Sequence, residues 1–477
     1  MTGDERLLIG IDGGTQSTKV LVFDVSGRVI AQGVCRLRPM AMPGPGRFEH
    51  PDDDLWDSLR TASRAAMAQL GERVRDVAAA GLCSIRFCRA LLRGDGSLAA
   101  PVLSWMDERV GQPQPPTPGV EWVTAASAYL TARLTGRVID SVANYAGIWP
   151  IDRTTWDWTH DAGRLAGMGL RPEGLAELVL PGEVLGRITT AAARATGLPA
   201  GIPVVATAND KAVEALGNGL LDPDQLMLSL GTYIAALRPA TAHLPDGPDR
   251  WTNFACLPHR YLDESSGIRR GLATLSWLRD LVGTELSQRA ATAGVASEEI
   301  MNRAAAQVPP GSRGLLTLLD WLAPTDQPQR RGGMIGFDAR HGWPEMYRSI
   351  LEGIALTMRQ RTEALLAAAN RKATSILVAG GGSASDPMMQ IVADVFELPA
   401  SRTAVTSGAG LGAAICAAVA AGIHPDFRQA VTAMVHPGAT FHPVPDAVRI
   451  YRRLLPVYTR LPTELDATLH RLHDLGL

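Results

Sequence analysis

A run of small, polar and charged residues near the N-terminus has the composition of a phosphate-binding turn. It reads Asp12-Gly13-Gly14-Thr15-Gln16-Ser17-Thr18-Lys19. Glycines let backbone N–H groups turn toward an anion, Thr15 and Ser17 add hydroxyl donors, and Lys19 adds positive charge. Asp12 stands at the end of an apolar stretch, where a carboxylate can hold a hydrated Mg²⁺. A plain hairpin turn is the alternative, and the complete string favours phosphate binding over it.

Two further glycine-containing turns occur in the second half of the chain. They are Ser229-Leu230-Gly231-Thr232 and Gly380-Gly381-Gly382-Ser383. Each is a weak signal alone, because tight hairpins and strand-to-helix turns often carry such residues. A triphosphate needs donors from two sides, so we expect the Gly-Thr turn to face Thr15 across a cleft. The triple glycine would let the backbone approach a nucleotide closely.

Asp210 is the carboxylate best placed for proton transfer. It follows the short apolar stretch 204–208 and precedes a small-residue helix predicted at 212–219. A carboxylate at the end of a strand can accept a proton from an alcohol nucleophile. It can equally cap the N-terminus of the helix that follows, and both interpretations stay open at this point.

The elements that must position these residues alternate between strand and helix. Hydrophobic patterning predicts strands at 7–11, 19–24, 28–33, 77–82 and 375–379, a strand–turn–strand unit at 225–237, and helices at 52–70, 125–135, 343–369 and 387–396, the last with Asp386 as its N-cap. Both halves therefore contain a strand, a Gly-Thr turn and a second strand. This repetition indicates an internal duplication with a cleft between the two halves.

Composition excludes several classes of protein. The 477 residues fit two or three domains, 46% are hydrophobic, and the net charge is −2, without the basic excess of a nucleic-acid binder. Five cysteines form no CxxC pair, which favours a reducing, cytoplasmic compartment over a disulfide scaffold or a thiolate zinc site. The uncharged segment 403–425 is long enough to span a membrane, but its glycines and alanines favour a buried helix. We therefore expect no membrane partner.

Taken together and in this order, the motifs resemble those of the FGGY carbohydrate kinases, relatives of the actin/hexokinase ATPases. The matching segments are 10–24, 101–109, 129–136, 209–219, 229–232, 331–337, 350–355, 379–399 and 412–414. The resemblance implies an α/β protein with two ribonuclease-H-like domains, each a mixed sheet flanked by helices, around an interdomain cleft. The expected domains are residues 1–226 and 227–477.

The resemblance also implies roles for individual residues in an ATP-dependent, Mg²⁺-using kinase for a small sugar, polyol or sugar acid. Asp210 would be the general base, and Asp12 and Asp210 would lie at the metal. The implied nucleotide contacts are Gly13, Gly14, Thr15, Ser17, Lys19, Gly231, Thr232, Gly336, Gly380, Gly381, Gly382, Ser383, Asp386 and Met389. Asp107 and Arg109, from a W-x-D-x-R element, would lie at the edge of the sugar pocket.

Where the sequence departs from the family pattern, it leaves the substrate open. Cys83-Ser84-Ile85-Arg86-Phe87-Cys88 replaces a polar run. Arg86 would either pair with a nearby acid or bind a carboxylate or extra polar group of the substrate. Asn144 and Tyr145 are further candidates for the sugar site. The tryptophans, Trp105 among them, are expected to pack in the core or at the cleft rim, where one could stack on a sugar.

The expected substrate is a small sugar, polyol or sugar acid, with a pentulose or hexulose type favoured. A sugar-independent actin-like ATPase and a non-catalytic sugar sensor are the alternatives, although the presence of Asp12, Lys19 and Asp210 speaks against a sensor. A homodimer is one assembly that the sequence allows.

Overall fold

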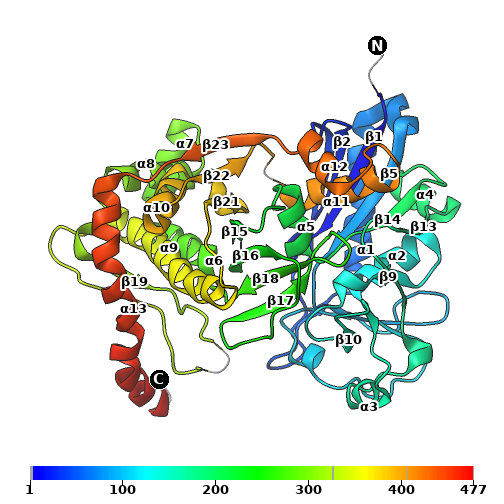
Figure 1. Cartoon of the computed structure of the whole chain (residues 1–477), viewed down its shortest axis with the longest axis horizontal. Helices are drawn as coiled ribbons and strands as arrows, with labels where there is room; N and C mark the ends of the chain where they lie inside the picture. The colour runs from blue at the N-terminus through cyan, green and yellow to red at the C-terminus, as the bar shows by residue number, and fades with distance from the viewer. Residues whose placement is uncertain (1–3, 232, 325–326, 406, 476–477) are drawn as a thin grey trace.

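Two mixed β-sheets organise the molecule (Figure 1). The structure is a computed structural model and describes residues 4–231, 233–324, 327–405 and 407–475. The first sheet has the spatial order β13 (Val184–Arg187), β14 (Pro203–Ala206), β5 (Val77–Ser84), β1 (Leu7–Gly13), β2 (Ser17–Asp24), β3 (Val29–Arg36). The second has the order β17 (Arg250–Phe254), β18 (Tyr261–Ser265), β16 (Ile234–Ala240), β15 (Gln225–Leu230), β21 (Ser375–Ala379), β22 (Ala400–Thr403), β23 (Pro437–Phe441). We call the parts built on these sheets the N lobe and the C lobe.

The strand pairing repeats between the two sheets. In the N lobe, β1 pairs antiparallel with β2 and parallel with β5, which in turn pairs parallel with β14. In the C lobe, β15 pairs antiparallel with β16 and parallel with β21, which pairs parallel with β22. The predicted duplication and the predicted pair of actin-like α/β domains are confirmed.

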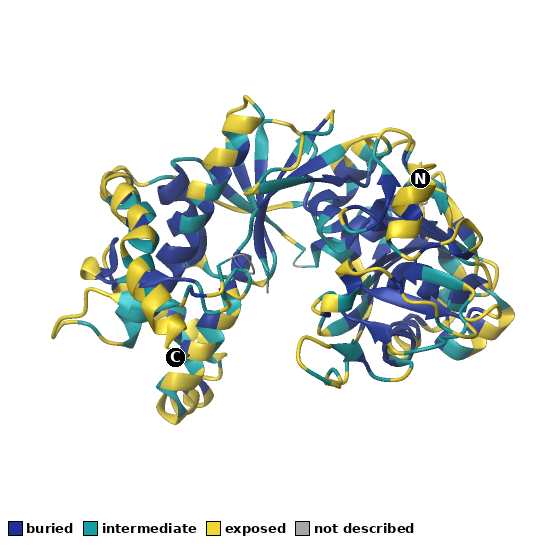
Figure 2. Ribbon diagram, turned by 90° about the horizontal axis from the view of Figure 1, so that it is seen from below, coloured by how far each residue is buried: buried dark blue, intermediate teal, exposed yellow. Residues whose placement is uncertain are grey.

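Helices cover both faces of the first sheet. Alternate residues of β1 point to opposite sides: Leu7 belongs to a core shared with α1 (Asp54–Leu70), and Leu8 to a core shared with α11 (Gly408–Ala420). Burial on both faces explains why β1 and β2 are apolar almost throughout. Figure 2 shows buried strands inside each lobe, with exposed residues on the outer helices.

Helix α11 comes from late in the chain but packs on the N-lobe sheet (Figure 1). The backbones touch: a Cβ on Gly10 of β1 would lie 1.8 Å from the carbonyl oxygen of Gly410, and one on Gly81 of β5 would lie 2.0 Å from that of Ala413. The helix within the uncharged segment 403–425, α11, is therefore buried in the protein, as predicted. Across the described part of the chain, no helix is both long and apolar enough to cross a membrane.

The remaining elements complete the two lobes. In the N lobe they are β4 (Glu49–His50), β6 (Arg89–Leu92), β7 (Val102–Leu103), β8 (Trp122–Ala125), α2 (Ala126–Thr135), β9 (Ile139–Ser141), β10 (Ile151–Asp152), β11 (Asp157–Trp158), α3 (Ala162–Gly167), β12 (Glu177–Val179), α4 (Thr190–Thr196) and α5 (Asp210–Gly217). Later in the chain come α6 (Gly271–Val282), α7 (Thr284–Ala293), α8 (Ser297–Gln307), β19 (Leu316–Leu318), β20 (Gly333–Ile335), α9 (Trp343–Ala368), α10 (Asp386–Phe396), α12 (Phe427–Met434) and α13 (Pro445–Asp474). One predicted cap is wrong: Ser385, not Asp386, caps α10, because its hydroxyl accepts from the N–H of Met388.

Candidate active site

A cavity of about 690 Å³ lies between the two lobes. The N lobe contributes the turn between β1 and β2, the start of α5 and the segment after β5. The C lobe contributes residues after β15 and around β17. The residues that line the cavity are Asp12, Gly14, Thr15, Gln16, Ser17, Lys19, Ile85, Arg86, Phe87, Trp105, Gly147, Arg153, Asp210, Lys211, Tyr233, Asp246 and Trp251. The N-terminal turn and Asp210, far apart in sequence, therefore meet in one cavity as predicted from their chemistry.

The turn between β1 and β2 presents an acidic and a basic side chain, Asp12 and Lys19, side by side. Asp12 lies opposite Lys19 in the antiparallel ladder, and the N–H of Gly14 donates to the carbonyl of Ser17 at 3.0 Å. Burial raises the pKa of Asp12 to about 6; Lys19 acts against this rise, and the nearby acids Asp210 and Glu214 add to it. A carboxylate whose pKa is raised by neighbouring acids gains from a cation placed beside it, because the cation offsets the repulsion between the like charges.

Asp210 is the first residue of α5, and its carboxylate faces the cavity. Asn209 caps this helix through its side-chain oxygen, which accepts from the N–H of Ala212 at 3.3 Å. The alternative in which Asp210 caps the helix is therefore wrong. Burial raises the pKa of Asp210, while the charges of Arg86 and Lys211 oppose the rise. A carboxylate with a raised pKa, still 31% exposed in a cavity, is suited to accept a proton.

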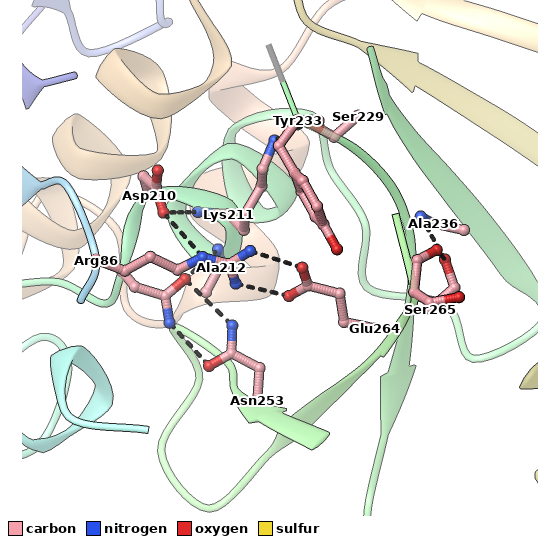
Figure 3. Close-up of polar contacts among 12 residues, drawn as sticks. Arg86, Asp210, Lys211, Ala212, Ser229, Tyr233, Ala236, Asn253, Glu264 and Ser265 are labelled. Carbon is pink, nitrogen blue, oxygen red and sulfur yellow. Dashed lines mark hydrogen bonds and ion pairs between the residues drawn. The ribbon is translucent and has the colours of Figure 1, made fainter. Parts of the chain in front are cut away.

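Arg86 spans the two lobes at the cavity wall (Figure 3). Its two terminal nitrogens each donate to one oxygen of Glu264 on β18 at 2.7 Å, and its Nε lies 3.8 Å from Asp210 Oδ1. Glu264 is fully buried. Burial opposes the charge on Arg86, but Glu264 outweighs it and raises the pKa of Arg86 above its usual value. The bidentate face of the guanidinium is thus occupied by a protein carboxylate.

Aromatic rings enclose the Arg86 guanidinium. Its carbon lies 5.0 Å from the centre of the Phe87 ring and 5.2 Å from that of Trp251. Phe87 has a positive φ of 64°, unusual for a large residue, and a Cβ on Gly147 would lie 2.8 Å from its ring. Glycine at 147 is therefore needed for Phe87 to point into the cavity.

The turn between β15 and β16 lies against the triple-glycine loop. A Cβ on Gly380 would lie 2.5 Å from the carbonyl oxygen of Leu230, and one on Gly382 would lie 2.7 Å from the Leu230 side chain. Ser383 closes the loop by donating to the carbonyl of Gly380 at 2.7 Å. The structure thus brings Gly231 and Gly380 together, as their predicted roles require. Thr232 lies outside the described residues.

Comparison with known proteins agrees with this arrangement. Residues 7–114 and 118–217 match the model for the N-terminal domain of the FGGY family of carbohydrate kinases, and residues 226–421 match the model for its C-terminal domain. The chain belongs to this family. It is therefore a phosphotransferase with an alcohol group as acceptor, and ATP is its phosphoryl donor.

Individual relatives cover almost the whole kinase. The uncharacterized sugar kinase YgcE of Escherichia coli is 46% identical over 448 residues, which is 94% of this chain and 91% of that protein. The gluconate kinase from Lactobacillus acidophilus has a TM-score of 0.82 at 21% identity, covering 98% of this chain and 99% of that one. The Plasmodium falciparum glycerol kinase with ADP has a TM-score of 0.80 at 16% identity, covering 96% and 98%. At these identities the two structures establish the fold alone.

In this kinase the W-x-D-x-R element is divided between cavity and core. Trp105 lines the cavity, whereas Asp107 is buried and accepts from the N–H of Phe48 at 2.8 Å and from Arg109 Nε at 2.9 Å. Arg109 also donates to Glu49 at 2.7 Å. Burial opposes the ionised carboxylate, but the bonds from Arg109 and Phe48 outweigh it and lower the pKa of Asp107. In the structure Asp107 and Arg109 therefore connect the segment after β7 to β4 and to Phe48 just before it. Contact of either residue with the substrate stays a prediction.

Five other predicted positions lie away from the cavity lining. Met389 is fully buried in an apolar cluster, Asp386 pairs with Arg402 at 2.8 Å, and Asn144 and Tyr145 are buried beside Asp140. Gly336 follows β20 with φ of 101°, where a Cβ would lie 2.4 Å from the carbonyl oxygen of Gly314. Packing or backbone geometry accounts for Met389 and Gly336, and their nucleotide contacts remain predictions.

Sequence reasoning missed most of the C-lobe side of the kinase cavity. Tyr233, Asp246 and Trp251 line it, and Asp246 forms a bidentate pair with Arg153 of the N lobe at 2.9 and 3.1 Å. Tyr233 could have been found, because it directly follows the Gly-Thr turn. Asp246 lies in the loop between β16 and β17, and Trp251 lies near the start of β17, where no motif distinguishes them.

Proposed function

We propose that this kinase transfers the terminal phosphoryl group of ATP to a hydroxyl of a small neutral ketose or polyol, with Asp210 as general base. The observation that carries the proposal is the position of Asp210: its carboxylate lines the same cavity as the Asp12–Lys19 turn. A base and a phosphate-binding turn within one cavity of this size are what a phosphoryl transfer to an alcohol requires.

The reaction balances with the residues of this cavity. The substrate hydroxyl oxygen forms a bond to the terminal phosphorus, the bond from that phosphorus to the bridging oxygen of ADP breaks, and the hydroxyl proton goes to Asp210. Backbone N–H groups of the first turn and the ammonium of Lys19 stabilise the phosphate charge. Two lobes around the reacting atoms exclude water, which would otherwise hydrolyse ATP.

The acids in the cavity fit a magnesium ion bound together with the nucleotide. Asp12 and Asp210 both line the cavity, and the charge of Asp210 helps to raise the pKa of Asp12. Among the residues that the structure describes, no group of three or more His, Cys, Asp or Glu side chains could hold a metal ion by itself. Mg²⁺ commonly takes one or two carboxylates and completes its shell with phosphate and water. When bound, it would neutralise part of the phosphate charge.

The cavity wall favours a neutral substrate over a sugar acid. Arg86 and Arg153 line it, but Glu264 and Asp246 already hold their guanidinium groups in bidentate pairs. A substrate carboxylate would have to displace a protein carboxylate from either arginine. The aromatic rings of Phe87, Trp105 and Trp251 instead offer apolar surface on which the C–H face of a sugar can pack.

A coupled ADP-release assay over pentuloses, hexuloses, polyols and aldonates tests the proposal. We expect a neutral compound to stimulate ADP release strongly, and Asp210→Asn to lower kcat by about 10²–10⁴-fold, because the hydroxyl loses its proton acceptor. Asp222→Asn, at an exposed aspartate beyond α5, is the matched control and should keep full activity.

The rival functions give different results in the same assay. ADP release that ignores every sugar would indicate an ATPase, and binding without turnover would indicate a sensor. Activity of Asp210→Asn equal to wild type would remove Asp210 as the base. Stimulation by aldonates alone would overturn the neutral substrate. The cytoplasmic location and the homodimer remain predictions from composition and family.

A further inference from the structure

The two phosphate turns occupy equivalent places but carry different charges. In the first, Asp12 lies opposite Lys19 in the β1–β2 ladder. In the second, the equivalent position on β15 is Ser229, and it lies opposite Ala235 on β16. The duplicated turn therefore has neither the acid nor the ammonium group of the first, although both face the same nucleotide in the proposed function.

Lys211 reaches the second turn from the other lobe. Its ammonium donates to the hydroxyl of Ser229, lies 3.4 Å from the carbonyl oxygen of Tyr233, and would lie 3.9 Å from a Cβ on Gly231 (Figure 3). Lys211 directly follows Asp210 and lines the cavity. An ammonium group thus stands at the second turn where the ladder itself supplies none.

The carboxylate nearest to Lys211 leaves that ammonium available. Glu214, one turn further along α5, lies 3.5 Å from the Lys211 nitrogen and accepts a hydrogen bond of 2.5 Å from Ser229. The distance of 3.5 Å between Lys211 and Glu214 is longer than the 2.7 Å contacts that hold Arg86 to Glu264. Lys211 is 13% exposed, so a phosphate oxygen entering the cavity can reach it.

The use of lysine in this chain is itself selective. Lysine and arginine together number 46, but only Lys19, Lys211 and Lys372 are lysines. Two of these three line the same cavity. Lysine presents a compact point charge, whereas arginine presents a planar fork suited to bidentate pairs such as those of Arg86 and Arg153. Lysine at these two positions fits contact with a phosphate oxygen in a confined space.

We propose that Lys211 binds the terminal phosphate of ATP at the second turn, as Lys19 does at the first, and stabilises the charge on the phosphoryl group during transfer. This inference rests on the proposed kinase function and adds a catalytic residue to it. The lysine keeps its proton throughout, since it acts through charge and hydrogen bonding. Because Lys211 adjoins the general base, a single turn of α5 would orient both the phosphoryl donor and the acceptor.

A purely structural role makes a different prediction. If Lys211 only connects α5 to β15, its removal would weaken the contact between the lobes and lower the affinity for ATP and for ADP to the same extent. If it contacts the terminal phosphate, the loss would be confined to the triphosphate. The ratio of the two affinities therefore separates the roles even when a variant is less stable.

The test measures Kd for ADP and for the nonhydrolysable analogue AMP-PNP by calorimetry with Mg²⁺, in wild type, Lys211→Met, Lys211→Arg and Lys372→Met. We expect Lys211→Met to raise the Kd for AMP-PNP by about 10- to 100-fold, as for a lost hydrogen bond to a charged group. The Kd for ADP should change by less than about twofold. Lys211→Arg should recover part of the loss because it keeps the charge. The exposed Lys372 is the matched control.

Failure of this inference is distinguishable from failure of the proposed function. Equal weakening of ADP and AMP-PNP in Lys211→Met, or no change in either, would overturn the role of Lys211 while wild type still shows sugar-stimulated turnover. Wild type without such turnover would overturn the proposed function, whatever the variants bind.

Discussion

The turn between β1 and β2 and its counterpart between β15 and β16 have the same strand pairing but different chemistry. The first carries Asp12 and Lys19 on adjacent strands. The second has Ser229 opposite Ala235, and its surroundings come from elsewhere: α5 from the N lobe and the Gly380 loop from its own. One turn is chemically complete, and the other is assembled by neighbouring elements.

This difference shows how a duplicated fold can divide a task. The backbone of each turn offers N–H groups, so both copies can bind phosphate, but only the first has a carboxylate for a metal ion. The second turn instead depends on correct placement of the two lobes. Polar pairs that cross between the lobes provide this placement: Arg86 with Glu264, and a reciprocal amide pair between Asn209 and Asn253 at 2.8 and 3.2 Å.

Between the two turns, the largest expected difference comes from removing the side-chain polar group of Asp12 in the first and of Ser229 in the second. Asp12→Asn should lower kcat by about 10²–10³-fold, because it removes a carboxylate from the proposed metal site. Ser229→Ala should cost about tenfold or less, because it removes only a neutral hydroxyl that positions Lys211. Steady-state kinetics on the substrate found in the screen, with circular dichroism to confirm folding, measures both. Equal losses in the two variants would contradict the division of tasks.

A smaller effect concerns the acid limb of the pH profile. The pKa of Asp12 is raised to about 6 and that of Asp210 is also raised, and both groups must be ionised to act. We therefore expect kcat/KM to fall as pH decreases through about 6. Lys19 lowers the pKa of Asp12, so Lys19→Met should move this limb to higher pH by up to about one unit. Lys372→Met should leave it in place, and a limb that moves to lower pH in Lys19→Met would refute the assignment.

Much of this architecture could be predicted because the strands are buried on both faces. The strand at 375–379 has the predicted ends, and β1 and β2 differ from prediction by only two residues. Apolar runs bounded by Gly-containing turns mark such strands clearly. The same turns carry the phosphate chemistry, so the first half of the site was visible together with the fold.

The rest of the site depends on contacts that local sequence does not encode. Arg86 and Glu264 are 178 residues apart, and the sequence around either residue does not predict that the two form a pair. Asp107 and Arg109 form a motif, but tertiary packing directs them to each other and to Glu49 instead of the cavity. The neighbours Asn209 and Asp210 both have cap-forming side chains, and only the backbone conformation decides that Asn209 caps α5.

The smallest expected effect is on stability, where the two turns should respond with opposite signs. The pKa of Asp12 in the folded protein is about 6, above its ordinary value of 3.8, so folding favours the protonated form. The stability linked to this group is complete below pH 3.8 and is lost as pH rises through 6. At about pH 7.5 the ionised carboxylate therefore destabilises the ligand-free protein. Asp12→Asn should raise its stability by about 1 kcal/mol, a value reduced for the partial exposure of the side chain.

Ser229→Ala should instead lower stability by about 1 kcal/mol at every pH, because it removes the hydroxyl that Lys211 and Glu214 both bond. Thermal unfolding of both variants at about pH 7.5 and about pH 5, without nucleotide, measures the two signs. The gain in Asp12→Asn should shrink at the lower pH, since wild-type Asp12 is then mostly protonated. An Asp12→Asn variant that unfolds at a lower temperature than wild type at the higher pH would show that the charge of Asp12 does not destabilise the first turn. The contrast between a self-sufficient turn that carries a destabilising charge and an assisted turn that does not would then be lost.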